Sequence, residues 1–186
     1  MRAFLAVVVE GEETVSRLRA LIARLREIRG LRTVPPHQLH FTLRFFEDLP
    51  EAQLAGAKAA AARAAADSSL FSLELSGLGT FPPLRPPRVL WAGCGYGSED
   101  LLALSSSVER EFTLEGFLPE SRPFSPHLTL ARVKDPRAAR DAAHFAAANA
   151  AFDGGTVEVR ELVLFQSVLG ASGAAHTPLG RFPLGR

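Results

Sequence analysis

The sequence predicts an α+β fold of two similar lobes, in which two antiparallel sheets face a central cleft and helices lie on the outside. Three observations indicate this. Strand-like and helix-like segments alternate, the order strand, helix, strand, helix, strand occurs twice, and a proline-rich segment at residues 81–87 separates the two copies. The copies span about residues 1–85 and 86–186, and we expect this internal duplication to form one bilobal domain over residues 1–186.

The first copy begins with residues 3–9, whose aliphatic and β-branched side chains are typical of a strand. A helix is predicted after Gly11, because apolar residues recur at three- and four-residue steps as far as Ile28. A strand at residues 39–47, an alanine-rich helix at residues 51–66 and a half-buried strand at residues 71–75 complete the copy.

The second copy repeats this order from residues 88–92, which resemble residues 2–6. Ser98 is in position to cap the next helix. A strand at residues 127 to about 133 follows, and Asp135-Pro136 is typical of the cap and first position of another helix. The remaining strands are predicted at residues 157–162 and 175–184.

Composition limits the classes of function. The net charge of +1 does not favour a protein that coats a long nucleic acid, so an RNA partner would be bound by a short end. The apolar stretch at residues 3–9 is far shorter than the roughly 20 residues of a membrane helix, and it lacks the flanks and the cleavage site of a signal peptide. We therefore expect a cytoplasmic protein with no membrane contact, monomeric by default. The single Cys94 excludes an internal disulfide and is expected to be a buried, inert thiol.

A histidine followed two residues later by a threonine occurs at the same place in each copy. The motifs are His40-Phe41-Thr42-Leu43 and His127-Leu128-Thr129-Leu130, 87 positions apart. Five histidines and eight threonines in 186 residues would give about 0.2 such triplets by chance. Chance is therefore a poor explanation for two of them.

Strand alternation assigns these side chains to faces. His40 and Thr42 would project to one side of their strand, while Phe41, Leu43 and Phe45 would project to the other. Arg44 would share the face of His40, either lining the cleft or remaining a solvated charge. If a pseudo-twofold axis relates the lobes, with the motif strands central in their sheets, the two imidazoles converge. One ring could then accept a proton while the other donates one, since imidazole titrates near neutral pH.

The motifs and their surroundings resemble those of a known family. Residues 122–132, which include the second motif, closely resemble the RNA 2′,3′-cyclic phosphodiesterases of bacteria and archaea, also called 2′-5′ RNA ligases, of the two-histidine phosphoesterase superfamily. The resemblance covers nearly the whole chain. It includes residues 2–6, 77–81, 87–93 and 161–164.

The resemblance implies hydrolysis of the 2′,3′-cyclic phosphate at an RNA 3′ end to a 2′-phosphate, without metal or cofactor. It makes His40 the proton donor to the departing 3′ oxygen and His127 the proton acceptor that activates water. Thr42, Thr129 and Arg132 correspond to residues that bind the phosphate. Simple alternation from His127 would turn Arg132 away from the site, so its role requires a bulge after Leu130.

The family resemblance also indicates the partners, and it leaves ligation and the choice of substrate open. The partners would be RNA ends with a cyclic phosphate, tRNA fragments being one source, and reverse 2′-5′ ligation is left open. Relatives usually have glycine where this chain has Phe46, and an aromatic residue where it has His176. Both differences would affect the rim of the pocket and the choice of substrate.

Three alternatives remain beside this interpretation. The substrate could be a small cyclic nucleotide or an ADP-ribose cyclic phosphate, or the chain could bind RNA ends without turnover. A metal site could instead use His37 and His40 with His127 or His144. No carboxylate or cysteine accompanies either motif, and zinc normally takes three or four protein ligands, which disfavours the metal site.

Overall fold

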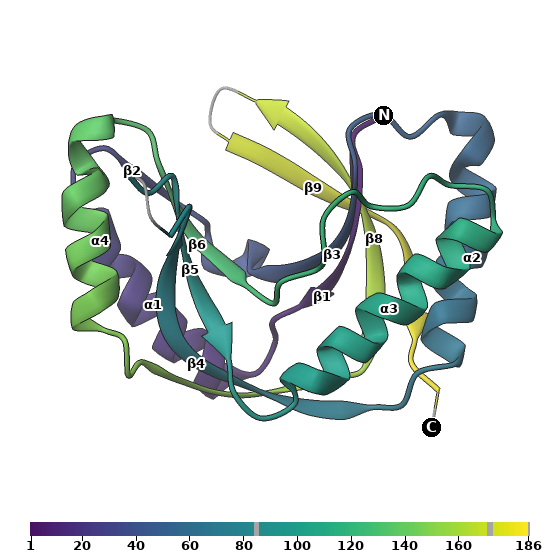
Figure 1. Ribbon diagram of the computed structural model, residues 1–186, viewed down its shortest axis with the longest axis horizontal. Coiled ribbons are helices and arrows are strands. Elements are labelled where there is room, and N and C mark those ends of the chain that lie inside the picture. The colour runs from purple at the N-terminus through teal and green to yellow at the C-terminus, as the bar shows by residue number, and fades with distance from the viewer. Residues whose placement is uncertain (84–85, 171–172, 186) are drawn as a thin grey trace.

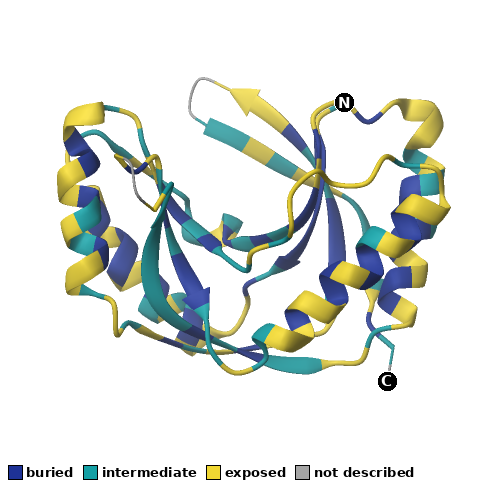
Figure 2. Cartoon of the chain, viewed as in Figure 1, coloured by how far each residue is buried: buried dark blue, intermediate teal, exposed yellow. Residues whose placement is uncertain are grey.

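The computed structural model describes residues 1–83, 86–170 and 173–185, so residues 84–85 of the predicted linker lie outside it. Four helices and two antiparallel sheets make up the described part of the chain (Figure 1). The α+β class and the two antiparallel sheets predicted from the sequence are confirmed. Buried positions gather where the helices meet the sheets (Figure 2).

Sheet A has four strands in the order β3-β1-β8-β9, and the helices α2 and α3 cover its outer side. The core between sheet A and these helices includes Leu5, Phe41 and Leu164. The alanines of α2 allow that helix to approach the sheet closely. The bounds are β1 (Ala3–Val8), β3 (His40–Phe46), β8 (Glu161–Gly170), β9 (Gly173–Pro183), α2 (Leu54–Ala66) and α3 (Ser98–Leu114).

Sheet B has five strands in the order β2-β6-β5-β4-β7, and the helices α1 and α4 cover its outer side. The bounds are β2 (Leu31–Thr33), β4 (Phe71–Phe81), β5 (Val89–Cys94), β6 (Leu128–Val133), β7 (Asp153–Val159), α1 (Glu12–Arg26) and α4 (Ala139–Ala148). Three short 3₁₀ helices complete the described elements: η1 (Pro36–Gln38), η2 (Glu51–Gln53) and η3 (Pro136–Ala138).

The two lobes do not coincide with the two sequence copies. The segments α1, β2 and β4 from the first copy belong to sheet B, whereas α3, β8 and β9 from the second copy belong to sheet A. The neighbouring strands nevertheless correspond, since β3-β1-β8 in one sheet matches β6-β5-β4 in the other. Each lobe is therefore assembled from both halves of the chain.

The expected central position of both motif strands is wrong for β3. Within the described residues, β3 is at an edge of sheet A, while β6 has β2 on its outer side. The chain that leaves β2 runs through η1 into β3, and it hydrogen bonds both sheets on the way. The Val34 N–H donates to the Leu130 carbonyl at 2.8 Å, and the Val9 N–H donates to the Leu39 carbonyl at 3.0 Å. This crossing segment connects the two motif strands.

Local details also differ from the sequence prediction. The single strand predicted at residues 157–162 is divided between two strands, β7 and β8. The strand β2 was not predicted, because three residues are too few to show an alternation of apolar and polar side chains. Ser98 does not cap α3, because Gly97 precedes the helix with φ +81° and no side chain caps it. A Cβ at Gly97 would lie 2.1 Å from the Ser72 carbonyl oxygen, so only glycine fits. Asp135 does cap η3, accepting a hydrogen bond from the Arg137 N–H at 3.0 Å.

A bulge interrupts each motif strand at the same place. Opposite β1, Leu43 is an extra residue between the paired positions Thr42 and Arg44. Opposite β5, Leu130 is the extra residue between Thr129 and Ala131. Each bulge reverses the alternation of faces for the residues that follow it. The bulge required for Arg132 is therefore present at Leu130.

The bulges change the faces that simple alternation predicts. Arg132 turns to the face of His127, and Phe45 turns to the face of His40 rather than away from it. Arg44 turns to the core side, where it is 5% exposed, so the prediction that it shares the face of His40 is wrong. It forms an ion pair with Glu109 and lies over the ring of Phe112.

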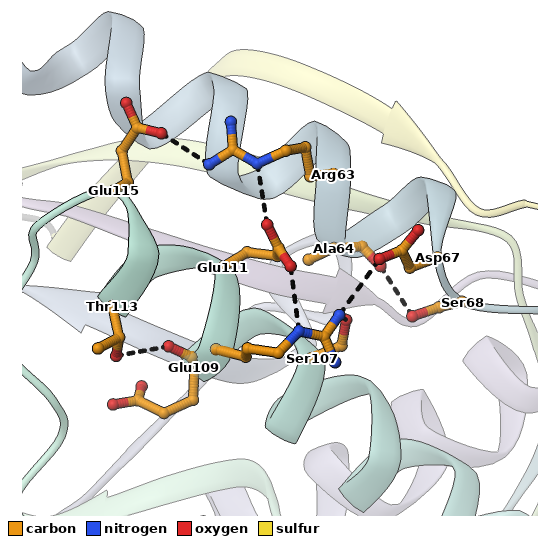
Figure 3. Close-up of polar contacts among 10 residues, drawn as sticks. Arg63, Ala64, Asp67, Ser68, Ser107, Glu109, Glu111, Thr113 and Glu115 are labelled. Atoms are coloured by element: carbon orange, nitrogen blue, oxygen red, sulfur yellow. Dashed lines mark hydrogen bonds and ion pairs between the residues drawn. The ribbon is translucent and has the colours of Figure 1, made fainter.

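The helices α2 and α3 are joined by a network of charged side chains (Figure 3). The carboxylate of Glu111, 8% exposed, accepts hydrogen bonds from Arg63 Nε at 2.9 Å and Arg110 Nε at 3.1 Å. These hydrogen bonds hold the pKa of Glu111 below its ordinary value. Arg63 also contacts Glu115, and Arg110 contacts Asp67, so the network extends along both helices.

The buried position of Arg44 predicts a large effect on stability. Arg44→Ala should lower the free energy of unfolding by about 3 kcal/mol, because it removes a large buried side chain together with its ion pair to the half-buried Glu109 and its aromatic contacts. Arg137→Ala is the matched control, since Arg137 is 93% exposed and should change stability by less than about 0.5 kcal/mol. Urea denaturation measures both values. A similar small loss in the two variants would contradict the structural role of Arg44.

Candidate active site

The two histidines are held in the same way by their own backbone. His40 begins β3 and His127 directly precedes β6. In each ring Nδ1 lies close to the carbonyl oxygen two residues earlier, at 2.6 Å for Gln38 and 2.7 Å for Ser125. A carbonyl oxygen only accepts, so Nδ1 donates and the proton of the neutral ring is fixed there. Nε2 is then the position of each ring that is free to exchange a proton with a ligand.

The electrostatic environment of His40 shows that side chains from both sheets gather around it. Burial lowers the pKa of His40 to about 4, against the hydrogen bond to the Gln38 carbonyl, which raises it. The positive charges of His176, Arg132 and His127 lower the pKa further. His40 is therefore neutral at pH 7, and His127 and Arg132 lie near enough to influence its pKa.

The two threonines occupy equivalent positions beside the histidines. Thr42 is opposite Ala6 of β1, and Thr129 is opposite Trp91 of β5. Both side chains are half-buried. Across residues 1–83, 86–170 and 173–185, neither hydroxyl has a hydrogen-bond partner in the protein. Each hydroxyl is thus available to donate to an oxygen of a ligand, as the sequence motif predicts.

Neighbouring rings pack against each motif histidine, and of these the sequence pattern indicated only His176. On sheet A, Phe4 stacks on His40 with a centroid distance of 4.6 Å, and His176 meets His40 edge-on at 5.5 Å. On sheet B, the rings of Phe81 and His127 are nearly perpendicular, with a centroid distance of 5.2 Å. Only tertiary contacts reveal the other rings, because Phe4 looks like any core residue of a strand in the sequence.

Trp91 forms part of the same face of sheet B. Its indole covers Gly79, where a Cβ would lie 2.3 Å from the ring, so glycine is required there. The Trp91 Nε1 atom is buried and has no hydrogen-bond partner in the described part of the chain. Residues 77–81 and 87–93, which support the family resemblance, thus pack together under Thr129.

A cavity of about 230 Å³ adjoins His40. It is lined by Val8, His37, Gln38, Leu39, His40, Phe165, Ala175 and His176. A larger cavity, about 510 Å³, is lined by residues that include Pro82, Pro87 and Val133 and contains none of the motif residues. The smaller cavity is the better candidate for a ligand, because His37, His40 and His176 line it.

The other histidines considered for a metal site, His37 and His144, do not gather with both motif histidines. His37 lines the cavity near His176, while His144 is an exposed residue of α4. Among the described residues, no three His, Cys, Asp or Glu side chains come together as a metal site would require. Cys94 is half-buried, and burial raises the pKa of its thiol to about 12. None of the described helices is long and apolar enough to span a membrane.

A family model, relatives with a similar sequence and a solved structure all identify the same family. The model of the 2′-5′ RNA ligase superfamily matches residues 12–170. A protein of Aeropyrum pernix named RNA 2′,3′-cyclic phosphodiesterase is 36% identical over 165 residues, covering 85% of this chain and 92% of that protein. A protein of the same name from Methanothermobacter thermautotrophicus is 34% identical over 186 residues, covering 99% of each chain.

A solved structure agrees with these relatives. The crystal structure of the Thermus thermophilus protein TT0787 superposes with a TM-score of 0.82 at 33% identity, and the alignment covers 99% of this chain and 98% of that one. The resemblance noted in the sequence motifs is thereby confirmed, over nearly the full length of the chain. The protein belongs to the 2′-5′ RNA ligase superfamily.

Proposed function

We propose that this protein hydrolyses the 2′,3′-cyclic phosphate at the 3′ end of RNA to a 2′-phosphate. The observation that most directly supports this is the matched pair His40 and His127, each with Nδ1 bound to a carbonyl oxygen and Nε2 free. The relatives named RNA 2′,3′-cyclic phosphodiesterase support the same reaction. We assign the catalytic roles to the two histidines and phosphate binding to Thr42, Thr129 and Arg132.

The reaction needs one proton acceptor and one proton donor. The oxygen of a water molecule forms a bond to phosphorus while the bond from phosphorus to the ribose 3′ oxygen breaks. His127 Nε2 accepts the proton of the attacking water, and His40 Nε2 donates a proton to the 3′ oxygen. The same two proton transfers, in the same direction, give a 2′-5′ ligation when a ribose 5′ hydroxyl replaces water as the nucleophile, and we include that ligation in the proposal.

The lowered pKa of His40 sets a condition for its role as donor. At pH 7 the ring is neutral in the free protein, so it must gain a proton when the substrate binds. A bound phosphate has a negative charge and favours the imidazolium form, which raises the pKa of His40. The same phosphate pairs with Arg132 and offsets a positive charge that otherwise disfavours that proton.

We extend the proposal to the location, the oligomeric state, the cofactor use and the RNA substrate of the enzyme. We propose a cytoplasmic, monomeric enzyme that uses no metal or cofactor and acts on RNA ends such as those of cleaved tRNA. The net charge of +1 supports recognition of a short RNA end rather than of a long duplex.

Replacing either motif histidine should greatly reduce turnover. His40→Ala and His127→Ala should each lower kcat by about 10²–10⁴-fold on an oligonucleotide with a 2′,3′-cyclic phosphate. The double variant should lose less than the product of the two single losses, because both rings act on one transition state. Thr42→Ala and Thr129→Ala should lose about 10-fold each, since each removes one hydrogen bond to a charged oxygen.

His144→Ala is the matched control for these variants, because His144 is exposed on α4 and should leave kcat unchanged. A substrate with a better leaving group than the 3′ oxygen tests the roles of the two rings. It should restore turnover in the variant of the donor, His40→Ala, and not in that of the acceptor. Restoration in His127→Ala alone would reverse the assignment, and full activity in either single variant would end the two-histidine mechanism.

The environment of His40 predicts an unusual titration. In the free protein its ring should titrate near pH 4, below the ordinary value of about 6.5 for histidine, because burial and nearby positive charges disfavour the protonated form. Saturation with a nucleoside 2′-phosphate should raise this pKa. Histidine NMR signals measure both values, with His40→Ala identifying the signal. A pKa that stays near 4 with the phosphate bound would contradict donation by His40 at neutral pH.

Activity should not depend on a metal ion. Because two imidazoles supply both proton transfers, turnover of the cyclic phosphate should persist in excess EDTA and should not rise when zinc or magnesium is added. The initial rate before and after chelation is the measurement. Loss of turnover in EDTA that one metal restores would instead indicate a metal-dependent hydrolase.

A further inference from the structure

Two arginines lie directly opposite each other beside the motif of sheet B. Arg32 of β2 pairs in register with Arg132 of β6. Residues opposed in this way share a face of the sheet, with Cβ atoms about 5 Å apart. Both side chains are exposed. Across residues 1–83, 86–170 and 173–185, neither guanidinium has a carboxylate partner, so two positive charges face each other without a counterion.

This pair lies on the face of the proposed active site. The bulge at Leu130 turns Arg132 to the side of Thr129, and its charge reaches His40 of the other sheet. Arg32 is the cross-strand neighbour of Arg132 on that same side. A ligand phosphate placed between His40 and His127 would therefore have Arg132 beside it and Arg32 one strand further out.

Arg32 also extends from sheet B to the hairpin of β8 and β9 in sheet A. A Cβ built on Gly173 would lie 2.8 Å from Arg32 Nη2. The neighbouring Ala174 carbonyl accepts a hydrogen bond from Gln38 Nε2 at 3.0 Å, and Gln38 lines the cavity beside His40. The Arg32 guanidinium thus lies close to the backbone of Gly173, near the segment that lines the cavity.

We propose that Arg32 binds a second phosphate of the substrate, the phosphodiester on the 5′ side of the terminal nucleotide, while Arg132 beside it pairs with the cyclic phosphate. This inference rests on the proposed function. Like charges that face each other across a strand pair destabilise the sheet, and an anion between them removes that repulsion. Guanidinium groups are suited to phosphate because their paired N–H groups match two of its oxygens.

The proposal identifies the substrate class. A mononucleotide 2′,3′-cyclic phosphate has a single phosphate and leaves Arg32 without a partner, whereas an RNA end of two or more nucleotides provides the second one. The site therefore favours an oligoribonucleotide end over a small cyclic nucleotide. A single additional phosphate contact also agrees with the net charge of +1, which offers no long basic surface for further RNA.

The experiment compares two substrates that differ by one phosphodiester. They are cytidine 2′,3′-cyclic phosphate and the dinucleotide ApC ending in the same cyclic phosphate. The ratio of kcat/KM for the dinucleotide to that for the mononucleotide should fall by about 10-fold in Arg32→Ala, mainly through KM, since one charged contact is lost. Arg19→Ala, which removes an exposed arginine of α1, should keep the wild-type ratio.

Salt dependence gives an independent measurement of the same contact. The slope of log kcat/KM against log salt for the dinucleotide should become shallower by about 0.7 in Arg32→Ala, the value for one phosphate of a single strand. An unchanged ratio and slope would overturn the proposal. An equal loss for both substrates would also overturn it, since Arg32 would then act at the cyclic phosphate or on the structure of the cleft. The melting temperature of each variant identifies an effect on folding.

Binding of products separates this proposal from the proposed function. The dissociation constants of cytidine 2′-phosphate and of ApC ending in a 2′-phosphate are measured by calorimetry for wild type and Arg32→Ala. Tighter binding of the dinucleotide that disappears in Arg32→Ala supports the second phosphate site, even if the wild type turns over neither cyclic phosphate. Equal binding of the two ligands by the wild type overturns the site, whatever the catalytic result.

Discussion

The whole cleft depends on one extra residue in each motif strand. Without the bulge at Leu130, Arg132 would point into the core and Ala131 would take the face of His127. Without the one at Leu43, Phe45 would point into the core and Arg44 would take the face of His40. The bulges also let two consecutive residues of each strand face the core. Each strand can thus pack two neighbouring residues against the core and still present its histidine and threonine on the other face.

The bulges also explain how much of the site the sequence predicts. Alternation is sufficient for His40 and Thr42, because they precede the bulge, and it fails for Arg44 and Phe45, which follow it. The family resemblance led to the bulge in the second motif, since Arg132 requires it, but no such requirement drew attention to the first. A register shift depends on hydrogen bonds to a neighbouring strand, and the chain's own periodicity does not record them.

The fold shows the same division between local and tertiary information. Helices and most strands follow from hydrophobic periodicity, because each element has a continuous apolar face. The exchange of segments between lobes does not, since nothing in the local pattern of α1 or β4 indicates which sheet it will join. For the same reason, the sequence pattern does not single out Arg32. Its role depends on β2, a three-residue strand that exists only through pairing with β6.

The exchange of segments between the lobes has a consequence for synthesis of the chain. Ala3 of β1 pairs with Gln166 of β8, so β1 is synthesised long before this partner strand of sheet A. Contacts this distant in sequence slow folding, because a long loop must close before they form. Until β8 is available, the apolar side chains of the short strand β1 must be shielded from water by another part of the chain. The nascent chain is therefore expected to depend on early pairing of β1 with β3, the nearer of its two partners.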